Sequence, residues 1–466
     1  MSAGCIAALV IGILLIVAGA AYFAIAYYFR SHFLPNTRIN RTDCSFYTLE
    51  EAVKILEEQA NDWSLTVTGQ DGIQEGILHA QDVGRSVDIQ KETEKLLANQ
   101  NSLEWILAYR RQDDYRASYD ITFDKEKMHT ALDSWDILDP EQMKAPEDAY
   151  ISDYLETEKA YRIIPEEKGS LLDREKVQKA VSAGIETGAD SVNLEEADCY
   201  IRAKITSEDT QLNKHLEELN RLVGSRIVID WNGSEVIVDG DLIHQWIIDD
   251  GKNVTLQEEA AAEFVAGQAK AHDTYGKKRK FTTTGGEVLT LPSGAYGWKT
   301  DRKKETEALV ALIQSGAKEN REPIYAAKGY CKGADDIGSS YVEINLTAQH
   351  LYLYKDGEIV LESDFVSGNM SKGYVTPAGV FGLTYKTKDA VLRGADYESK
   401  VKYWMPFNGN IGMHDASWRR SFGGEIYLTN GSHGCINLPT AKAREIYDVV
   451  TTLFPVVCYY LQEGTV

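Results

Sequence analysis

An uncharged, mostly apolar stretch at the N-terminus limits what this chain can fold into. It runs from Gly4 to Phe29 and contains no Asp, Glu, Lys or Arg. At about 1.5 Å per residue, a helix of this length crosses the roughly 30 Å hydrocarbon core of a bilayer. A secretory signal peptide would have a basic segment followed by a shorter apolar core. We therefore expect residues 1–32 to form a single transmembrane anchor, with cleavage at the small-residue run Ala18–Ala21 as the alternative.

The charge of the chain is unevenly distributed. The formal net charge is −22, which argues against a nucleic-acid partner because phosphate-binding surfaces are basic. From Tyr341 onward there are 13 acidic and 11 basic residues, so residues 30–340 carry 20 of the 22 excess negative charges. This change predicts a domain boundary near 335–340. The six cysteines form no CxxC pair or regular spacing, so no disulfide framework is expected.

Mixed helical and strand patterns fill residues 40–335. Thr48 to Glu58 opens with a capping box and continues at helical spacing, Asp173 starts a second helix, and Ala117–Phe123 alternates like a strand. Residues 40–225 are therefore predicted to form an α+β domain. A second α+β domain is predicted over 226–335, from a strand at Arg226–Trp231, a hairpin turn at Asn232–Gly233 and a helix at Leu256–Ala269.

The hydrophobic period changes to two after Ser340. This alternation predicts a mainly-β domain over 336–466. The expected strands are Tyr341–Leu346, Gln349–Tyr354, Glu358–Glu362, Val380–Tyr385 and Val456–Tyr460, and one helix is expected at Ala441–Thr451.

A histidine and a cysteine with catalytic potential lie in this last domain. Cys435 is embedded in Ser432-His433-Gly434-Cys435, and His414 precedes it by 21 positions. A neighbouring imidazole can lower the pKa of a thiol from its usual value of about 8.5 and activate it as a nucleophile. The glycine allows a tight turn in which the Gly434 and Cys435 amides face a developing oxyanion, with His433 as an auxiliary group.

Two other interpretations of these residues stay open on spacing alone. His414, His433 and Cys435 are a plausible set of ligands for a catalytic zinc ion. Alternatively, Cys435 is a small core residue and the two histidines lie on the surface or in turns. A papain-like peptidase is disfavoured because its cysteine precedes its histidine in the chain.

Residues 336–466 resemble the catalytic domain of the L,D-transpeptidases, the YkuD-like domain. The shared motifs are a histidine followed by Ser/Thr-His-Gly-Cys-x-Asn/Arg, here His414 and Ser432–Asn437, together with Thr376–Phe381 and Tyr403–Phe407. Asp415 departs from the glycine of many members. Tyr296–Asp301 is a weaker match to the peptidoglycan-binding domains that precede the catalytic domain in membrane-anchored members. The domains at 40–225 and 226–335 are accordingly expected to bind peptidoglycan or to act as spacers.

The resemblance implies a reaction and a role for each residue. Cys435 would attack the bond between the third residue and the terminal D-Ala of a tetrapeptide stem, and an acceptor stem would then form a 3→3 cross-link. His414 would be the general base, oriented by the Ser432 backbone carbonyl. The Gly434 and Cys435 amides would hold the oxyanion. The residues expected at the substrate cleft are Tyr403, Trp404, Met413 and Asn437. No cofactor or metal is expected, and carbapenems are expected to acylate the enzyme.

The resemblance also implies where the protein is located in the cell, and several other functions remain as alternatives. The expected partners are donor and acceptor peptidoglycan stems and the membrane, with a single-pass protein whose bulk faces the wall of a Gram-positive-type bacterium. Arg30, Arg38 and Arg41 follow the apolar segment and favour the opposite orientation by the positive-inside rule. An L,D-carboxypeptidase, an enzyme that attaches proteins to the wall, and a non-catalytic wall-binding protein are the alternatives.

Overall fold

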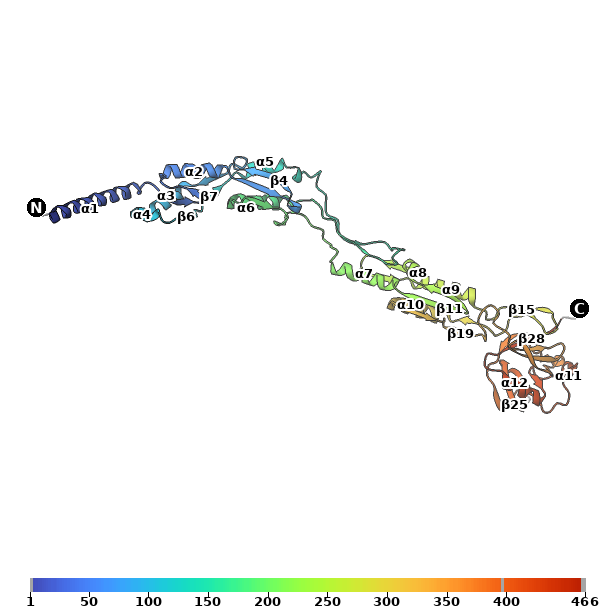
Figure 1. Ribbon diagram of the computed structural model, residues 1–466. Helices are drawn as coiled ribbons and strands as arrows, with labels where there is room; N and C mark the ends of the chain where they lie inside the picture. Colours follow the sequence, from blue (N-terminus) through green and yellow to red (C-terminus); the bar gives the residue numbers. More distant parts are fainter. Residues whose placement is uncertain (1–2, 395–397, 462–466) are drawn as a thin grey trace. The chain divides into compact units, whose positions relative to one another are not determined.

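The computed structural model describes residues 3–394 and 398–461, so the outer ends of the predicted segments 1–32 and 336–466 lie outside the described residues. Internal contacts divide the chain into two compact units (Figure 1). Unit one comprises Met1–Tyr150 and Ile164–Asp209, and unit two comprises Ile151–Ile163 and Thr210–Val466. Short strands β8 (Tyr150–Ile151) and β9 (Ile163–Ile164) pair with each other.

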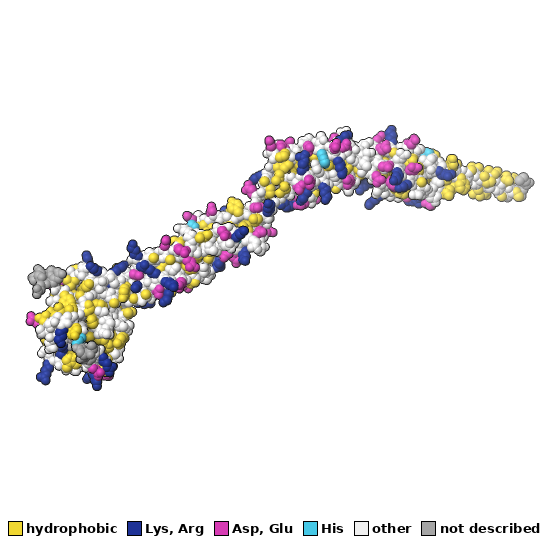
Figure 2. All heavy atoms as spheres, turned by 180° about the vertical axis from the view of Figure 1, so that it is seen from behind, with side chains coloured by type: hydrophobic (Ala, Val, Ile, Leu, Met, Phe, Trp, Pro, Cys, Tyr) yellow, Lys and Arg dark blue, Asp and Glu magenta, His cyan; other side chains and the backbone are white. Residues whose placement is uncertain are grey.

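The apolar N-terminal segment forms one long helix, α1 (Ala3–Tyr28). Its most apolar window has a mean hydropathy of 2.7, and none of that window is buried. Figure 2 shows the side chains of this helix as a continuous hydrophobic surface. Length and composition suit a membrane span, and a signal sequence near an N-terminus has the same properties.

The part of unit one that follows α1 contains two small cores. In the first, helix α2 (Leu49–Asn61) begins with the predicted capping box: Thr48 Oγ1 accepts from the Glu51 amide at 3.3 Å, and the Glu51 carboxylate accepts from the Thr48 amide at 2.8 Å. The other elements around this core are β1 (Thr37–Ile39), β2 (Thr42–Asp43), α3 (Gln90–Asn99), α4 (Trp105–Ala108), β6 (Asp113–Tyr115) and the pair β5 (Ser86–Asp88) and β7 (Asp120–Thr122).

The second core of unit one lies between a three-stranded sheet and two helices. Asp173 caps α6 (Arg174–Thr187) by accepting from two backbone amides, as its position predicts. The strand predicted over Ala117–Phe123 is shorter than expected, because the backbone of Ala117 bonds to the side chain of Asn40. The remaining elements are β3 (Ser64–Thr68), β4 (Gln74–His79), β10 (Ser191–Asn193) and α5 (Lys125–Asp133).

Unit two begins with a small α/β domain. Strand β11 (Arg226–Trp231) forms the predicted hairpin with β12 (Ser234–Val238), and the turn residues Asn232 and Gly233 have φ values of 52° and 90°. Both values suit the primed turns that connect twisted strands. The other elements here are α7 (Thr210–Val223), α8 (Gly240–Ile243), β13 (Ile247–Asp249), β14 (Val254–Leu256), α9 (Glu258–His272), β17 (Lys299–Thr300), α10 (Arg302–Ser315), β18 (Lys318–Arg321) and β19 (Tyr325–Ala327).

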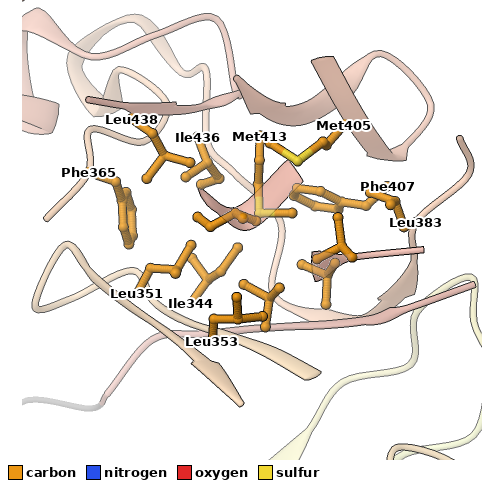
Figure 3. Packing of buried hydrophobic residues seen from close by; sticks show 14 of the residues in the cluster. Ile344, Leu351, Leu353, Phe365, Leu383, Met405, Phe407, Met413, Ile436 and Leu438 are labelled. Atoms are coloured by element: carbon orange, nitrogen blue, oxygen red, sulfur yellow. The ribbon is translucent and has the colours of Figure 1, made fainter. Parts of the chain in front are cut away.

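Two sheets form the C-terminal domain of unit two, and its mainly-β character is as predicted. One has the order β22-β21-β20-β28-β23, and the other has the order β24-β25-β26-β27. Figure 3 shows how side chains of both sheets interdigitate, with Ile344, Leu351 and Leu353 facing Met405, Phe407 and Met413. The bounds are β20 (Tyr341–Asn345), β21 (His350–Lys355), β22 (Glu358–Asp364), β23 (Gly379–Gly382), β24 (Thr387–Arg393), β25 (Glu398–Asn408), β26 (Ile411–Asp415), α11 (Ile426–Asn430), β27 (Ile436–Leu438), α12 (Thr440–Val449) and β28 (Pro455–Tyr459).

A hairpin from before the C-terminal domain completes one face of it. Strands β15 (Arg279–Thr282) and β16 (Val288–Leu291) contribute Phe281 and Leu291 to a core that also contains Val380 of β23 and Val457 of β28. The chain after this hairpin approaches β23 closely, since a Cβ on Gly294 would lie 2.0 Å from the Val380 carbonyl oxygen. The α/β domain and the C-terminal domain are therefore joined through a shared hydrophobic core.

Candidate active site

Parallel pairing of two strands brings the histidine and the cysteine together. Met413 and His414 of β26 pair with Ile436 and Asn437 of β27, so Cys435, immediately before β27, lies beside β26. A cavity of about 200 Å³, here called the active-site cavity, opens at this point. Of the predicted site residues, it is lined by His414, Ser432, His433, Cys435 and Asn437.

The loop that carries Cys435 is held by side-chain hydrogen bonds. Ser432 Oγ donates to the Cys435 carbonyl at 2.6 Å and accepts from the Gly434 amide at 3.0 Å. Thr376 Oγ1 donates to the Gly434 carbonyl at 2.7 Å and accepts from the Gly368 amide at 3.1 Å. Gly434 has a φ of 119°, a conformation that residues with a Cβ rarely adopt. The Thr376 and Ser432 motifs thus act together to shape this turn.

A different carbonyl from the predicted one contacts His414. The Ser432 carbonyl accepts from the Asn369 amide at 2.9 Å, whereas His414 Nδ1 lies 2.9 Å from the carbonyl of Asp415. The Ser432 carbonyl is occupied because Ser432 pairs with Gly368 in a β-bridge. With Nδ1 donating to the Asp415 carbonyl, Nε2 is the nitrogen that can accept a proton.

Burial keeps both groups of the pair uncharged. Burial raises the pKa of the Cys435 thiol to about 11, although a hydrogen bond from the Gly412 backbone acts in the opposite direction. Burial also lowers the pKa of His414, against the effect of the Asp415 carbonyl. The expectation of a thiol pKa lowered by the imidazole is therefore wrong, because the loss of hydration disfavours the thiolate. Cys435 Sγ donates to the Asn410 carbonyl at 3.5 Å.

The two predicted oxyanion amides differ in availability. The Gly434 amide is engaged by Ser432 Oγ at 3.0 Å. The Cys435 amide has no acceptor among the residues that the structure describes. Of the two amides, that of Cys435 is therefore the N–H donor left available among the described residues, and the Gly434 amide holds the turn.

The four residues expected at the substrate cleft lie in different places. Asn437 lines the active-site cavity. Trp404 is buried against Cys435, with its ring 5.9 Å from that of His414, and Tyr403 packs on Tyr447 at 5.4 Å. Met413 is fully buried in the main core, so its assignment to the cleft is wrong (Figure 3). Alternation along β26 explains this, because neighbours in a strand face opposite sides and His414 faces the cavity.

Several residues of the cavity were not predicted. These are Leu392, Ser399, Trp418, Arg419 and Gly431. Arg419 Nη1 donates to the Asn430 carbonyl at 2.8 Å, while its buried Nε has no hydrogen-bond partner among the described residues. Buried Asn437 Oδ1 is unpartnered there too. One feature of the sequence could have indicated Arg419. It belongs to the run Trp418-Arg419-Arg420, where two adjacent basic residues follow His414 closely in a domain whose net charge is only −2.

The charge of the described cavity lining comes from a single arginine. Arg419 lines the cavity, and no Asp or Glu does so among the described residues. Asp415 is buried outside it, where Oδ1 accepts from the Lys402 and Tyr403 amides at 2.7 and 2.9 Å. Asp415 thus supports β25 and β26. The cavity is suited to an anionic group on a substrate.

The geometry lends no support to a zinc site. Within residues 3–394 and 398–461, no group of three His, Cys, Asp or Glu side chains is placed to hold a metal ion. The His433 ring packs on Tyr374 with a centroid distance of 4.7 Å.

Comparisons with known proteins identify the domains. The family model of the L,D-transpeptidase catalytic domain matches residues 339–458, and that of a "putative peptidoglycan binding domain" matches residues 205–321. No curated protein matches the chain.

Solved structures of an Enterococcus faecium L,D-transpeptidase are similar to the chain. A cysteine-to-serine mutant of that enzyme is 33% identical, with 53% of this chain and 100% of that chain covered and a TM-score of 0.44. Its isolated catalytic domain is 42% identical over 26% of this chain and 96% of that chain, with a TM-score of 0.24. The same domain acylated by ertapenem is 42% identical over 26% of this chain and 97% of that chain, with a TM-score of 0.25.

The two family models together cover about half of this chain. The chain therefore belongs to the L,D-transpeptidase family, with a YkuD-like catalytic domain that contains Cys435 and His414.

Proposed function

We propose that this protein forms 3→3 cross-links in peptidoglycan through an acyl-enzyme on Cys435. The observation that carries the proposal is the neutral Cys435–His414 pair on one cavity, beside a Cys435 amide that has no acceptor among the described residues. A nucleophile, a base and an oxyanion donor are the groups that acyl transfer requires.

Each step moves one proton through His414. Sγ of Cys435 attacks the carbonyl of the third stem residue as Nε2 of His414 takes the thiol proton, and the oxyanion accepts from the Cys435 amide. The C–N bond then breaks, and His414 returns the proton to the nitrogen of the leaving D-Ala. A thioester remains. The side-chain amine of an acceptor stem attacks this thioester and loses a proton to His414, which returns it to the departing sulfur.

Arg419 is suited to recognise the donor stem. The terminal D-Ala of a tetrapeptide carries a free carboxylate, and Arg419 supplies the cavity with a buried, unpartnered N–H and no competing acidic residue in the described lining. Arginine binds carboxylates with directional, charge-assisted hydrogen bonds. This arrangement favours a tetrapeptide over a stem that ends in a neutral group.

The protein would act at the outer surface of the cell membrane, anchored by α1. The apolar surface of α1 and the peptidoglycan-binding domain model at 205–321 support this location. The part of the chain between α1 and the catalytic domain, residues 40–335, would space the site from the membrane or bind the wall. By the positive-inside rule, Arg30, Arg38 and Arg41 favour the reverse orientation. We give more weight to the substrate, because peptidoglycan lies outside the membrane. Degradation of the protein by protease added to intact cells tests this orientation, and full protection would overturn it.

The reaction is tested by incubating the full-length protein in detergent with a disaccharide-tetrapeptide and following the products by mass spectrometry. The expected product is a dimer lighter than two monomers by one free D-alanine, absent with Cys435→Ala. Tripeptide monomer without dimer would instead identify an L,D-carboxypeptidase. The absence of any Cys435-dependent product would favour attachment of a protein to the wall or a binding role.

A further inference from the structure

A cluster of exposed apolar side chains lies in a short helical segment of unit one. This segment, Ser102–Tyr109, consists of η2 (Ser102–Glu104), α4 and Tyr109. Leu103, Ile106, Leu107 and Tyr109 are 48%, 48%, 57% and 56% exposed. Contiguous exposed apolar side chains in a soluble domain mark a surface that binds another apolar partner.

The segment is attached to the membrane-type helix. Tyr22 of α1 donates a hydrogen bond from its hydroxyl to the Leu103 carbonyl. The ring of Trp105 lies 5.8 Å from that of Tyr22 and 6.3 Å from that of Phe29. The exposed apolar cluster is therefore continuous with the surface of α1 itself.

The length of α1 places this contact at the edge of the hydrocarbon layer. A helix of 26 residues is about 39 Å long at 1.5 Å per residue, whereas the hydrocarbon core is about 30 Å thick. About 20 residues, from Ala3 to Tyr22, are enough to cross it. Tyr22 then lies at the boundary, where tyrosine and tryptophan are enriched in membrane proteins. Its hydrogen bond holds Leu103 at the same depth.

Basic groups flank the cluster on the side of the headgroups. Arg30 follows α1 and lies over the ring of Tyr27 at 5.8 Å, and Arg110 is exposed directly after Tyr109. Arg111 forms an ion pair with Glu104 at 2.7 Å. This pairing neutralises an acidic side chain of the segment that would otherwise repel anionic lipid headgroups. Arginines beside an apolar surface contact lipid phosphates while their stems lie in the interface.

We propose that Ser102–Tyr109 is an interfacial membrane-binding element that inserts Leu103, Ile106, Leu107 and Tyr109 among lipids beside α1. The inference rests on α1 spanning the membrane, as the proposed function requires. Two attachments, one spanning and one interfacial, would restrict rotation of the first domain about the axis of α1. The occupant is the lipid bilayer that α1 would span, because the segment contacts α1 directly.

The test uses full-length protein in vesicles of phosphatidylcholine and phosphatidylglycerol whose acyl chains are brominated near the glycerol. Bromine quenches tryptophan fluorescence at short range, and Trp105 is one of eight tryptophans. We expect quenching by brominated lipid to fall at least twofold in Trp105→Phe. Trp418→Phe is the matched control, because Trp418 is an exposed tryptophan of the catalytic domain, and it should leave the quenching unchanged.

A second experiment introduces a charged side chain into the exposed apolar cluster. Leu107→Glu should lower the quenching of Trp105 at least twofold, whereas Ile237→Glu, at a 47% exposed isoleucine of β12, should have no effect. Binding of the protein to the vesicles is checked by flotation in a density gradient. If the protein floats with the vesicles but Trp105 is not quenched, the proposal is overturned, and the cluster would instead bind a protein partner. If the protein does not float with the vesicles, both the membrane-spanning role of α1 and this inference are wrong. The mass-spectrometric assay tests the proposed reaction independently of that result.

Discussion

Cys435 and His414 form a pair that is neutral at rest. Burial raises the pKa of the thiol to about 11 and lowers that of the imidazole below its ordinary value of 6.5. A thiolate–imidazolium ion pair would place two charges in a buried site, which is costly unless other groups stabilise them. No acidic side chain lines the described cavity to stabilise the imidazolium. Attack by sulfur and proton transfer to His414 are therefore expected in one step.

This pair predicts the pH dependence of acylation. The proposed mechanism requires the neutral form of His414, so the rate of acylation by ertapenem should fall only as the pH drops through the lowered histidine pKa. Between about pH 7 and pH 9 both groups keep their protonation state, because the thiol pKa is about 11. We expect a level profile over that range, measured by mass spectrometry of the acylated protein.

His414→Gln is the control for this profile. Without the base, only the thiolate attacks, and its fraction rises about tenfold per pH unit below the thiol pKa. The variant should be slow at pH 7 and accelerate steadily toward pH 9. A wild-type rate that rose in the same way would contradict the role of His414 as general base.

Arg419 predicts a preference for a donor with a free carboxylate. Removing a charge-assisted hydrogen bond costs about 1.5–3 kcal/mol, which corresponds to roughly 10- to 100-fold in rate. Arg419→Gln should lower kcat/KM for a tetrapeptide by that factor and leave the rate for the C-terminal amide nearly unchanged. Arg420→Gln, at the exposed neighbouring position, is the matched control. Equal losses with both donors would show that Arg419 only supports the fold.

At the scale of elements, the site depends on how β26, β27 and the loop before β23 meet. The parallel register of β26 and β27 sets the position of Cys435 relative to His414. The loop before β23 contributes Thr376, which is fully buried and bridges the Gly434 carbonyl and the Gly368 amide. The turn around Cys435 is therefore held from a segment almost 60 residues earlier in the chain.

Thr376→Val is expected to loosen this turn. The substitution keeps the shape of the side chain and leaves a buried carbonyl and a buried amide unpaired, which costs about 1–3 kcal/mol. Calorimetry should show a lower unfolding temperature of the catalytic domain, and acylation by ertapenem should slow by at least about tenfold. Thr387→Val, whose hydroxyl makes only a 3.4 Å contact, should change neither quantity. An unchanged acylation rate in Thr376→Val would refute the supporting role.

At the scale of the whole molecule, the two domains of unit two share a hydrophobic core. The β15–β16 hairpin covers β23 and β28, and a buried ion pair reinforces the contact. Arg279 Nε and Nη2 donate to the two carboxylate oxygens of Asp336 at 2.8 and 2.7 Å, and Asp336 is fully buried. Tyr296 adds a hydrogen bond from its hydroxyl to the Asp336 carbonyl at 2.6 Å.

Arg279→Gln tests this coupling. It leaves the Asp336 carboxylate buried without its cation, a change that destabilises a fold by about 3–5 kcal/mol. The calorimetric unfolding transition of the catalytic domain should move to a clearly lower temperature. Lys144→Gln removes one partner of the solvent-exposed Lys144–Glu167 pair and should leave that transition in place. If Arg279→Gln also left it in place, the hairpin would not stabilise the catalytic domain.

Local signals account for the elements that were predicted correctly. The caps at Thr48 and Asp173 and the turn at Asn232–Gly233 involve residues within a few positions of one another, so the sequence contains both partners. The second sheet of the catalytic domain lacked such a signal. All of β27 and four of the five residues of β26 are buried, so neither shows polar–apolar alternation, and β25 is interrupted by Pro406 and an irregular register.

The sequence by itself determined the apolar N-terminal helix, the mainly-β C-terminal domain and the residues of its motif, because composition, period and motif spacing are local properties of the chain. Tertiary structure alone decided which carbonyl contacts His414, which amide stays free beside Cys435, that Met413 is buried and that Arg419 reaches the cavity. It also decided the thiol pKa, since hydration is lost only when both sheets and the surrounding loops close around the sulfur. These properties depend on strand register and burial between segments far apart in sequence.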